Sequence, residues 1–141
     1  MKHAIWTIGL ALIAIAPLVT ADVPCSADCE VSGGAQGYLP PVLVMSNGAD
    51  VHWVTNDGGP HANTAAFSDP CISPDQVSFG PNGGSADVRM DIVGSELQST
   101  INGSTVTCTG AVALPDGSFV LHYFCVLHPT QMKAALLVLN D

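Results

Sequence analysis

Positive charge is scarce in this sequence. Among 141 residues there are three Lys and Arg side chains in all, against twelve Asp and Glu, and the formal net charge is −9. Proteins that bind nucleic acid or anionic lipid need clusters of Lys and Arg to meet the phosphate groups. The composition therefore excludes nucleic acid as a partner, and any contact with a membrane surface is expected to be peripheral.

Several motifs of catalysis and of helical architecture are missing as well. There is no Gly-x-Ser-x-Gly nucleophile elbow, no paired acid and base, and no His-x-His pair such as a multicopper oxidase needs. No heptad or internal repeat occurs, and the only helical signal lies in the first twenty residues. We therefore predict that the protein is not an enzyme and that its fold lacks long helices.

Residues 1–21 have the pattern of a signal peptide. A positive start, MKH, is followed by the uncharged run AIWTIGLALIAIAPLV and by the small-residue site Val19-Thr20-Ala21. This order is typical of a secretory signal that is cleaved after Ala21. An uncleaved membrane anchor is the alternative, because the run approaches the ~20 residues that span a bilayer. Either way we expect export to the periplasm, the cell surface or the extracellular space.

The remaining chain is long enough for one domain. We predict an N-terminal extension over residues 22–36, which contains two cysteines, and a single domain over residues 37–141. Without the signal, Arg89 and Lys133 face twelve carboxylates, so the formal charge becomes −10. This acidity either keeps an exported protein soluble or steers it toward a basic partner.

Five cysteines in an exported protein leave one without a disulfide partner. Cys125 differs from the others because it lies in an apolar, strand-like run. The other four lie in polar or turn-rich segments and are predicted to be in surface connections: Cys25, Cys29, Cys71 and Cys108. Export permits disulfides, and we favour the pairs Cys71 with Cys108 and Cys25 with Cys29, although all three pairings of these four stay open.

Short strands separated by Gly and Pro turns fill the chain after residue 37. Strands are expected over 40–45, 50–54, 76–79, 86–92, 118–125 and 134–139, whereas 67–81 and 94–109 are expected to form connections and edges rather than core. Asn47-Gly48 predicts a hairpin or a tight turn. By alternation, Val51 and Trp53 face the core and His52 faces outward. The fold class that follows is an all-β sandwich of Greek-key type.

The segment HYFCVLHPTQM concentrates soft metal-binding groups at the end of a predicted strand. Cys125, His128 and Met132 stand in Cys-x2-His-x3-Met spacing, and His61 follows a proline in a turn-rich segment far upstream. Two imidazoles, a thiolate and a weak axial thioether are the donor set of a blue-copper electron-transfer site. The other imidazole of this segment, His122, alternates away from the face of Cys125 and is predicted to be exterior.

Simpler interpretations of these residues exist. Cys125 could be an inert buried thiol, His61 a loop residue and Met132 a core side chain. A zinc or redox-sensing cysteine site is a further alternative, although Zn²⁺ sites rarely use a thioether. Gln131 competes with Met132 for the axial position, because a glutamine can also serve there. The occurrence of two histidines, a methionine and an unpaired cysteine in one β-rich domain favours metal binding over these simpler interpretations.

Two segments at the ends of the predicted domain resemble one family. YLPPVLVMSNGADVHWVTNDGGPH is similar to the first half of the plastocyanin/cupredoxin family of small type 1 copper proteins, and GSFVLHYFCVLHPTQMKAALLVL is similar to its C-terminal signature. The resemblance implies a cupredoxin-like fold with one copper ion, for which His61, Cys125 and His128 are equatorial ligands and Met132 is axial. Many relatives place Asn directly after the first histidine, whereas here Ala62 follows and Asn63 comes one place later.

The resemblance also implies a function. A small copper protein of this kind carries single electrons between redox proteins. The electrons enter and leave through the exposed edge of the C-terminal histidine, here His128. Leu127, Pro129 and Pro60 would form an apolar ring around it. We expect a monomer whose redox partners have a basic docking surface. A copper carrier or storage protein, and a binding module of the same fold without a redox role, remain as alternatives.

Overall fold

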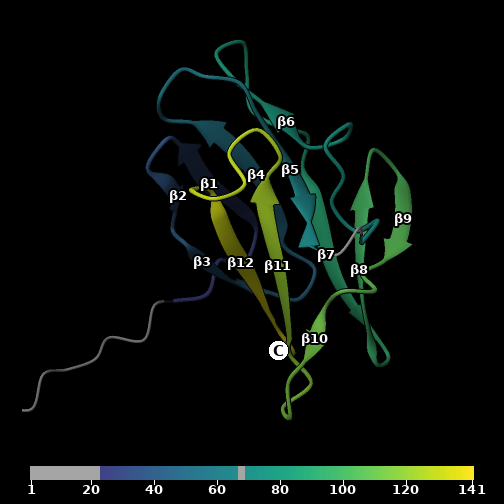
Figure 1. Ribbon diagram of the computed structural model, residues 1–141. Helices are drawn as coiled ribbons and strands as arrows, with labels where there is room; N and C mark the ends of the chain where they lie inside the picture. The colour runs from purple at the N-terminus through teal and green to yellow at the C-terminus, as the bar shows by residue number, and fades with distance from the viewer. Residues whose placement is uncertain (1–22, 67–68) are drawn as a thin grey trace, which may run out of the picture.

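The computed structural model describes residues 23–66 and 69–141 and contains twelve β-strands and no α-helix within them (Figure 1). The strands are β1 (Asp28–Gly34), β2 (Gly37–Leu39), β3 (Val42–Ser46), β4 (Asp50–Thr55), β5 (His61–Ala65), β6 (Ser78–Phe79), β7 (Val88–Val93), β8 (Glu96–Ile101), β9 (Ser104–Thr107), β10 (Val112–Ala113), β11 (Phe119–Cys125) and β12 (Lys133–Leu139). The predicted signal peptide lies outside the described residues. In the described ranges, no helix is long and apolar enough to span a membrane.

The strands form two packed sheets. One has the order β2-β1-β4-β7-β8-β9, and the other has the order β3-β12-β11-β5-β6, with β10 added beside β11. Two neighbouring pairs are parallel, β1 with β4 and β3 with β12, so the chain crosses repeatedly from one sheet to the other. This arrangement confirms the predicted all-β Greek-key sandwich.

The Asn47-Gly48 turn joins the two sheets and does not close a hairpin. The turn follows β3, which pairs with β12, and precedes β4, which pairs with β1 and β7. Gly48 has a φ of +79°, a conformation that glycine adopts without strain. The tight-turn prediction is confirmed, and the hairpin alternative is wrong because both strands find their partners far along the chain.

The core between the sheets includes segments that we expected to be connections. Val51 and Trp53 are fully buried, as alternation predicts, and His52 lies on the other face beside Glu30. The prediction for 94–109 is wrong, because β7, β8 and β9 form an antiparallel meander in which Leu97 is buried. In β8 every second residue is buried, a pattern that the many turn-forming residues around this strand hide in the sequence.

Both preferred disulfides are present, Cys25–Cys29 and Cys71–Cys108. Their predicted surface position is wrong for three of the four cysteines, since Cys29, Cys71 and Cys108 are buried. Of the five cysteines, all within the described part of the chain, Cys125 alone has a free thiol, and it is also buried.

Strand β1 belongs to the predicted N-terminal extension, and it lies within the first sheet, between β2 and β4. The division of the chain into a signal, an extension and a domain stays a prediction.

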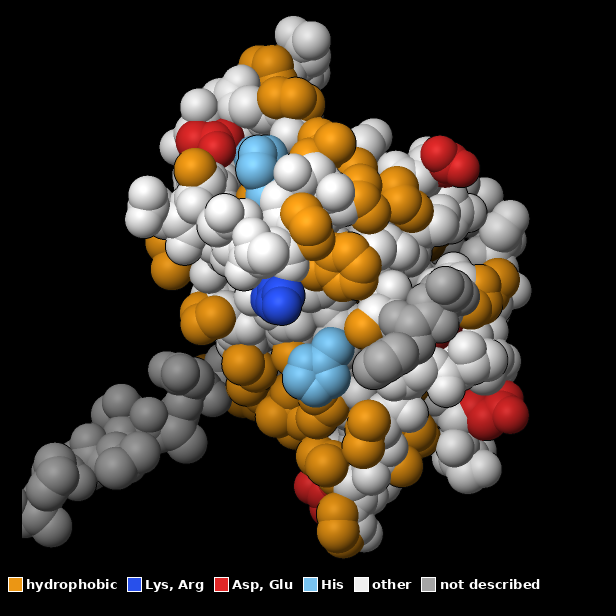
Figure 2. Space-filling model, viewed as in Figure 1, with side chains coloured by type: hydrophobic (Ala, Val, Ile, Leu, Met, Phe, Trp, Pro, Cys, Tyr) orange, Lys and Arg blue, Asp and Glu red, His pale blue; other side chains and the backbone are white. Residues whose placement is uncertain are grey.

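The two sheets differ in charge. In the first sheet, β1, β4, β7 and β8 carry five acidic side chains, namely Asp28, Glu30, Asp50, Asp91 and Glu96. Among the described strands of the second sheet there is no acidic residue, and Lys133 is their one Lys or Arg. Figure 2 shows the face over β11 and β12, where hydrophobic side chains gather in patches and acidic side chains lie toward the margins. The acidic character of the protein is therefore concentrated away from this face.

Candidate metal centre

Long-range strand pairing brings the two sequence motifs together. His61 begins β5, Cys125 ends β11, and these two strands are antiparallel neighbours with Cys125 opposite Asn63. The backbone N–H of Val126 donates to the carbonyl of Ala62 and extends this pairing past the end of β11. Register thus places a residue of the first motif beside the cysteine of the second, although 64 positions separate His61 from Cys125.

The loop from Cys125 to Met132 is closed by its own backbone hydrogen bonds. The N–H of His128 donates to the carbonyl of Cys125, the N–H of Met132 donates to the carbonyl of His128, and the N–H of Cys125 donates to the carbonyl of Met132. Because each of the three residues is bonded to another of them, the Cys-x2-His-x3-Met spacing corresponds to one compact turn.

Three ligand atoms converge on one point. Cys125 Sγ lies 3.8 Å from Nδ1 of His61 and 3.8 Å from Nδ1 of His128, and the three ligand atoms all lie within 4.8 Å of one another. For a first-row ion such as Zn²⁺, a nitrogen at about 2.0 Å and a sulfur at about 2.3 Å, at an angle of about 110–120°, stand roughly 3.5–3.7 Å apart. The observed separations therefore fit two ligands of a single metal ion.

Met132 occupies a buried position and Gln131 an exposed one. Met132 is fully buried, whereas the Oε1 of Gln131 accepts a hydrogen bond from Thr130 at the surface. Gly33 of β1 leaves the room that Met132 needs, because a Cβ at Gly33 would stand 3.0 Å from the methyl carbon of Met132. Of the two predicted axial candidates, burial favours Met132.

Asn63 connects the cysteine strand to the aromatic core. It is completely buried, and the hydroxyl of Tyr38 donates to its Oδ1, while its Nδ2 has no partner. Burial, followed by the nearby Tyr123 and Cys125, raises the pKa of Tyr38 well above its ordinary value, so the phenol stays a donor at neutral pH. Asn63 lies opposite Cys125 in the pairing of β5 with β11, and its side chain links that position to Tyr38.

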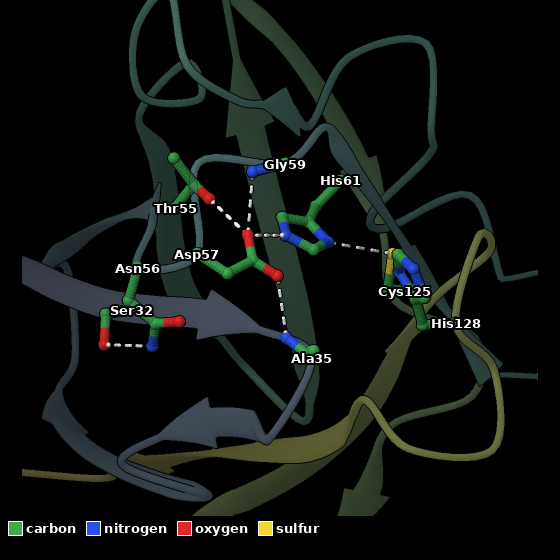
Figure 3. A network of polar contacts seen from close by, with 9 residues as sticks. All are labelled: Ser32, Ala35, Thr55, Asn56, Asp57, Gly59, His61, Cys125 and His128. Carbon is green, nitrogen blue, oxygen red and sulfur yellow. Dashed lines mark hydrogen bonds and ion pairs between the residues drawn. The ribbon is translucent and has the colours of Figure 1, made fainter.

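Asp57 is a contact of the site that the sequence pattern did not reveal. The segment 56–60 was expected only to form a turn, but Asp57 Oδ1 lies 3.0 Å from Nε2 of His61, whose side chain is fully buried (Figure 3). The bond to His61, followed by bonds from Gly59 and Thr55, lowers the pKa of Asp57 below its ordinary range, so this carboxylate is ionised at neutral pH. No local pattern in the sequence marks this contact, because a four-residue spacing brings side chains together on a helix and this segment is a turn that leads into β5.

His122, the other imidazole of the C-terminal segment, falls outside the cluster. His122 is exposed on β11 while its neighbour Tyr123 is buried, as alternation predicts. His61 and His128 differ in exposure, because His61 is 2% exposed and covered by the ring of Phe79, whereas His128 is partly exposed. The cluster therefore reaches the surface through His128.

Comparison with solved structures returns proteins of similar fold. A reduced-state proline-to-phenylalanine variant of amicyanin is 16% identical and has a TM-score of 0.43, with 86% of this chain and 87% of that chain covered. Amicyanin from Paracoccus versutus is 21% identical, with a TM-score of 0.40 and coverage of 84% and 86%. A purple cupredoxin from Nitrosopumilus maritimus is 18% identical, with a TM-score of 0.39 and coverage of 79% and 100%.

The chain is similar in fold to these cupredoxin structures. No family model matches the chain, and no curated protein matches it. Since the identities lie between 16% and 21% and the TM-scores are below 0.5, no ligand or residue role is transferred from these structures.

Proposed function

We propose that the protein is an exported single-electron carrier that holds one copper ion between His61, Cys125, His128 and Met132. The observation that carries the proposal is the convergence of the one free thiol with two imidazole nitrogens at 3.8 Å each. A thiolate, two imidazoles and a buried thioether on the following turn suit copper better than zinc. When bound, the copper supplies an exchange between the Cu(I) and Cu(II) states.

The protein supplies a rigid frame for that exchange. Cys125 and His61 lie on paired strands, and Met132 and His128 lie on a loop whose backbone is bonded to itself. Because strand pairing, the hydrogen bonds of the loop and the burial of His61, Cys125 and Met132 hold the side chains in place, they need little rearrangement when the charge of the site changes. A low reorganisation requirement is what a carrier needs, since it must both accept and release an electron.

His128 provides the route to a partner. Its ring is partly exposed, and the loop that carries it also presents apolar side chains to solvent, with Leu127 55% exposed and Val126 38% exposed. Pro60 and Pro129 are exposed as well. An apolar patch without fixed charges suits a brief encounter, while the formal charge of −10 after signal removal attracts a basic redox partner from a distance.

The electron-carrier role predicts fast, salt-dependent oxidation of the Cu(I) protein by a basic haem protein. Since the attraction acts over roughly 10 Å at 0.1 M salt, the bimolecular rate constant should fall several-fold between 10 mM and 500 mM salt. Stopped-flow absorption measures this rate. An acidic haem protein of similar potential is the control, and its rate should rise with salt.

Two alternative functions make opposite predictions for the same experiment. A copper carrier or storage protein would bind the ion tightly yet exchange electrons slowly with both haem proteins. A binding module of this fold would show no copper-dependent reaction. The monomeric state and the export of the chain belong to the proposal as well. Sedimentation of the purified protein tests the first, and cell fractionation tests the second.

A further inference from the structure

Asp57 occupies the outer side of His61. The imidazole lies between two groups, with Nδ1 3.8 Å from Cys125 Sγ and Nε2 3.0 Å from Asp57 Oδ1 (Figure 3). A carboxylate only accepts hydrogen bonds, so Nε2 must carry the proton that is shared with Asp57. In the neutral imidazole the other nitrogen, Nδ1, is then left with a free lone pair on the side of the cysteine.

The carboxylate is itself held in place by backbone and side-chain donors. Asp57 Oδ1 accepts hydrogen bonds from the N–H of Gly59 at 2.8 Å and from the hydroxyl of Thr55 at 2.9 Å, in addition to His61. Its Oδ2 accepts from the N–H of Ala35 at 2.8 Å, directly after β1. Four donors, three from residues 55–61 and one from Ala35, thus fix the orientation of this carboxylate. A turn alone would leave the side chain free to rotate.

We infer that Asp57 is a positioning residue of the metal centre, which fixes the Nε2–H tautomer of His61 and selects the higher oxidation state of the bound copper. The inference rests on the proposed function, since it assigns a role toward the ion of that same site. A negative charge on the outer nitrogen of a ligand strengthens the donation of the inner nitrogen. It also favours Cu(II), which carries one more positive charge than Cu(I).

The Asp57→Asn variant removes the charge with little change of shape. The amide keeps an acceptor oxygen for His61, Gly59 and Thr55 and loses the bond to Ala35. Outer partners of metal-bound histidines typically contribute 10–100-fold in metal affinity. We expect Cu(II) affinity to fall about tenfold more than Cu(I) affinity, which raises the reduction potential by about 59 mV for a one-electron couple.

The matched control is Asp28→Asn, which makes the same change in net charge. Asp28 is an exposed residue at the start of β1, about 20 Å along the strand from its end near Asp57. Voltammetry of the copper-loaded proteins should give a raised potential for Asp57→Asn and the wild-type potential for Asp28→Asn. Equal potentials for the two variants would overturn the inference, even if Asp57→Asn is less stable, because a merely structural role moves stability alone.

A second measurement needs no copper. In the metal-free wild type, ¹⁵N chemical shifts of the His61 ring should show one protonated nitrogen, Nε2. In Asp57→Ala, which lacks the acceptor, they should show a mixture of tautomers. Identical shifts in the two proteins would overturn the inference. Failure of the wild type to bind copper would refute the proposed function instead and leave this tautomer test in force.

Discussion

Replacement of Cys125 by serine is expected to abolish the copper centre. Cys125 Sγ is the atom that both imidazole nitrogens approach, and it is the one free thiol of the protein. A serine hydroxyl is a hard, weakly acidic donor that does not replace a soft thiolate. We expect the loss of the intense thiolate-to-copper absorption and a fall in copper affinity larger than the 10–100-fold that loss of an outer partner causes.

The controls for this variant separate ligand loss from misfolding. Cys125 is fully buried, so a serine there places a hydroxyl in the core at a cost of about 1–3 kcal/mol. Cys125→Ala avoids that hydroxyl and should also be colourless, while thermal melting of both metal-free variants verifies the fold. His122→Ala, on the exposed face of the same strand, should keep the wild-type spectrum. A Cys125 variant that keeps the absorption would disprove the ligand assignment.

Removal of the Cys71–Cys108 disulfide should cause a large loss of stability. The bridge closes a loop between residues 37 positions apart, for which the chain-entropy model gives about 4 kcal/mol. The bridge also lies at a polar junction, where the hydroxyl of Ser99 donates to the carbonyl of Cys71 and Asp69 accepts from the N–H groups of Cys71 and Thr109. Urea unfolding of the metal-free Cys71→Ala/Cys108→Ala variant measures the effect.

The second disulfide provides the comparison. Cys25 and Cys29 are four positions apart, and the same model gives about 2 kcal/mol for so short a loop. The Cys25→Ala/Cys29→Ala variant should therefore unfold at a higher urea concentration than the variant of the long loop. Both variants should form the copper centre, since neither bridge contains a proposed ligand. The reverse order of stabilities would contradict the entropic account of the long bridge.

The features that the sequence predicted are those that local patterns encode. Alternation around Val51 and Trp53 identified one core face, and the odd cysteine count singled out Cys125. The clustering of soft donors around Cys125 also indicated a metal centre, whose ligand set stays a prediction. The core face and the free thiol could be predicted because burial alternates with a fixed period along a strand and because an odd number of cysteines leaves one thiol unpaired.

The features that sequence patterns did not reveal depend on pairing between distant segments. Asn47-Gly48 has the same local chemistry whether its flanking strands pair with each other or with separate sheets, so the hairpin alternative could not be decided locally. The burial of Leu97 depends on the neighbouring strands of its sheet. In the sequence Asp57 is an ordinary turn residue, and its role depends on the fold, which places Ala35 and His61 within hydrogen-bond distance of its carboxylate. Register and tertiary contacts, rather than propensity, decided these cases.

The most direct test of the copper centre is an optical titration of the purified domain with Cu(II). The donor set predicts an intense blue thiolate-to-copper absorption that saturates at one equivalent of copper and bleaches reversibly on reduction. Mass spectrometry of the metal-free protein should at the same time find one free thiol, at Cys125. A protein that stays colourless at one equivalent, with its thiol free, would contradict the assignment of His61, Cys125 and His128 to a single copper site.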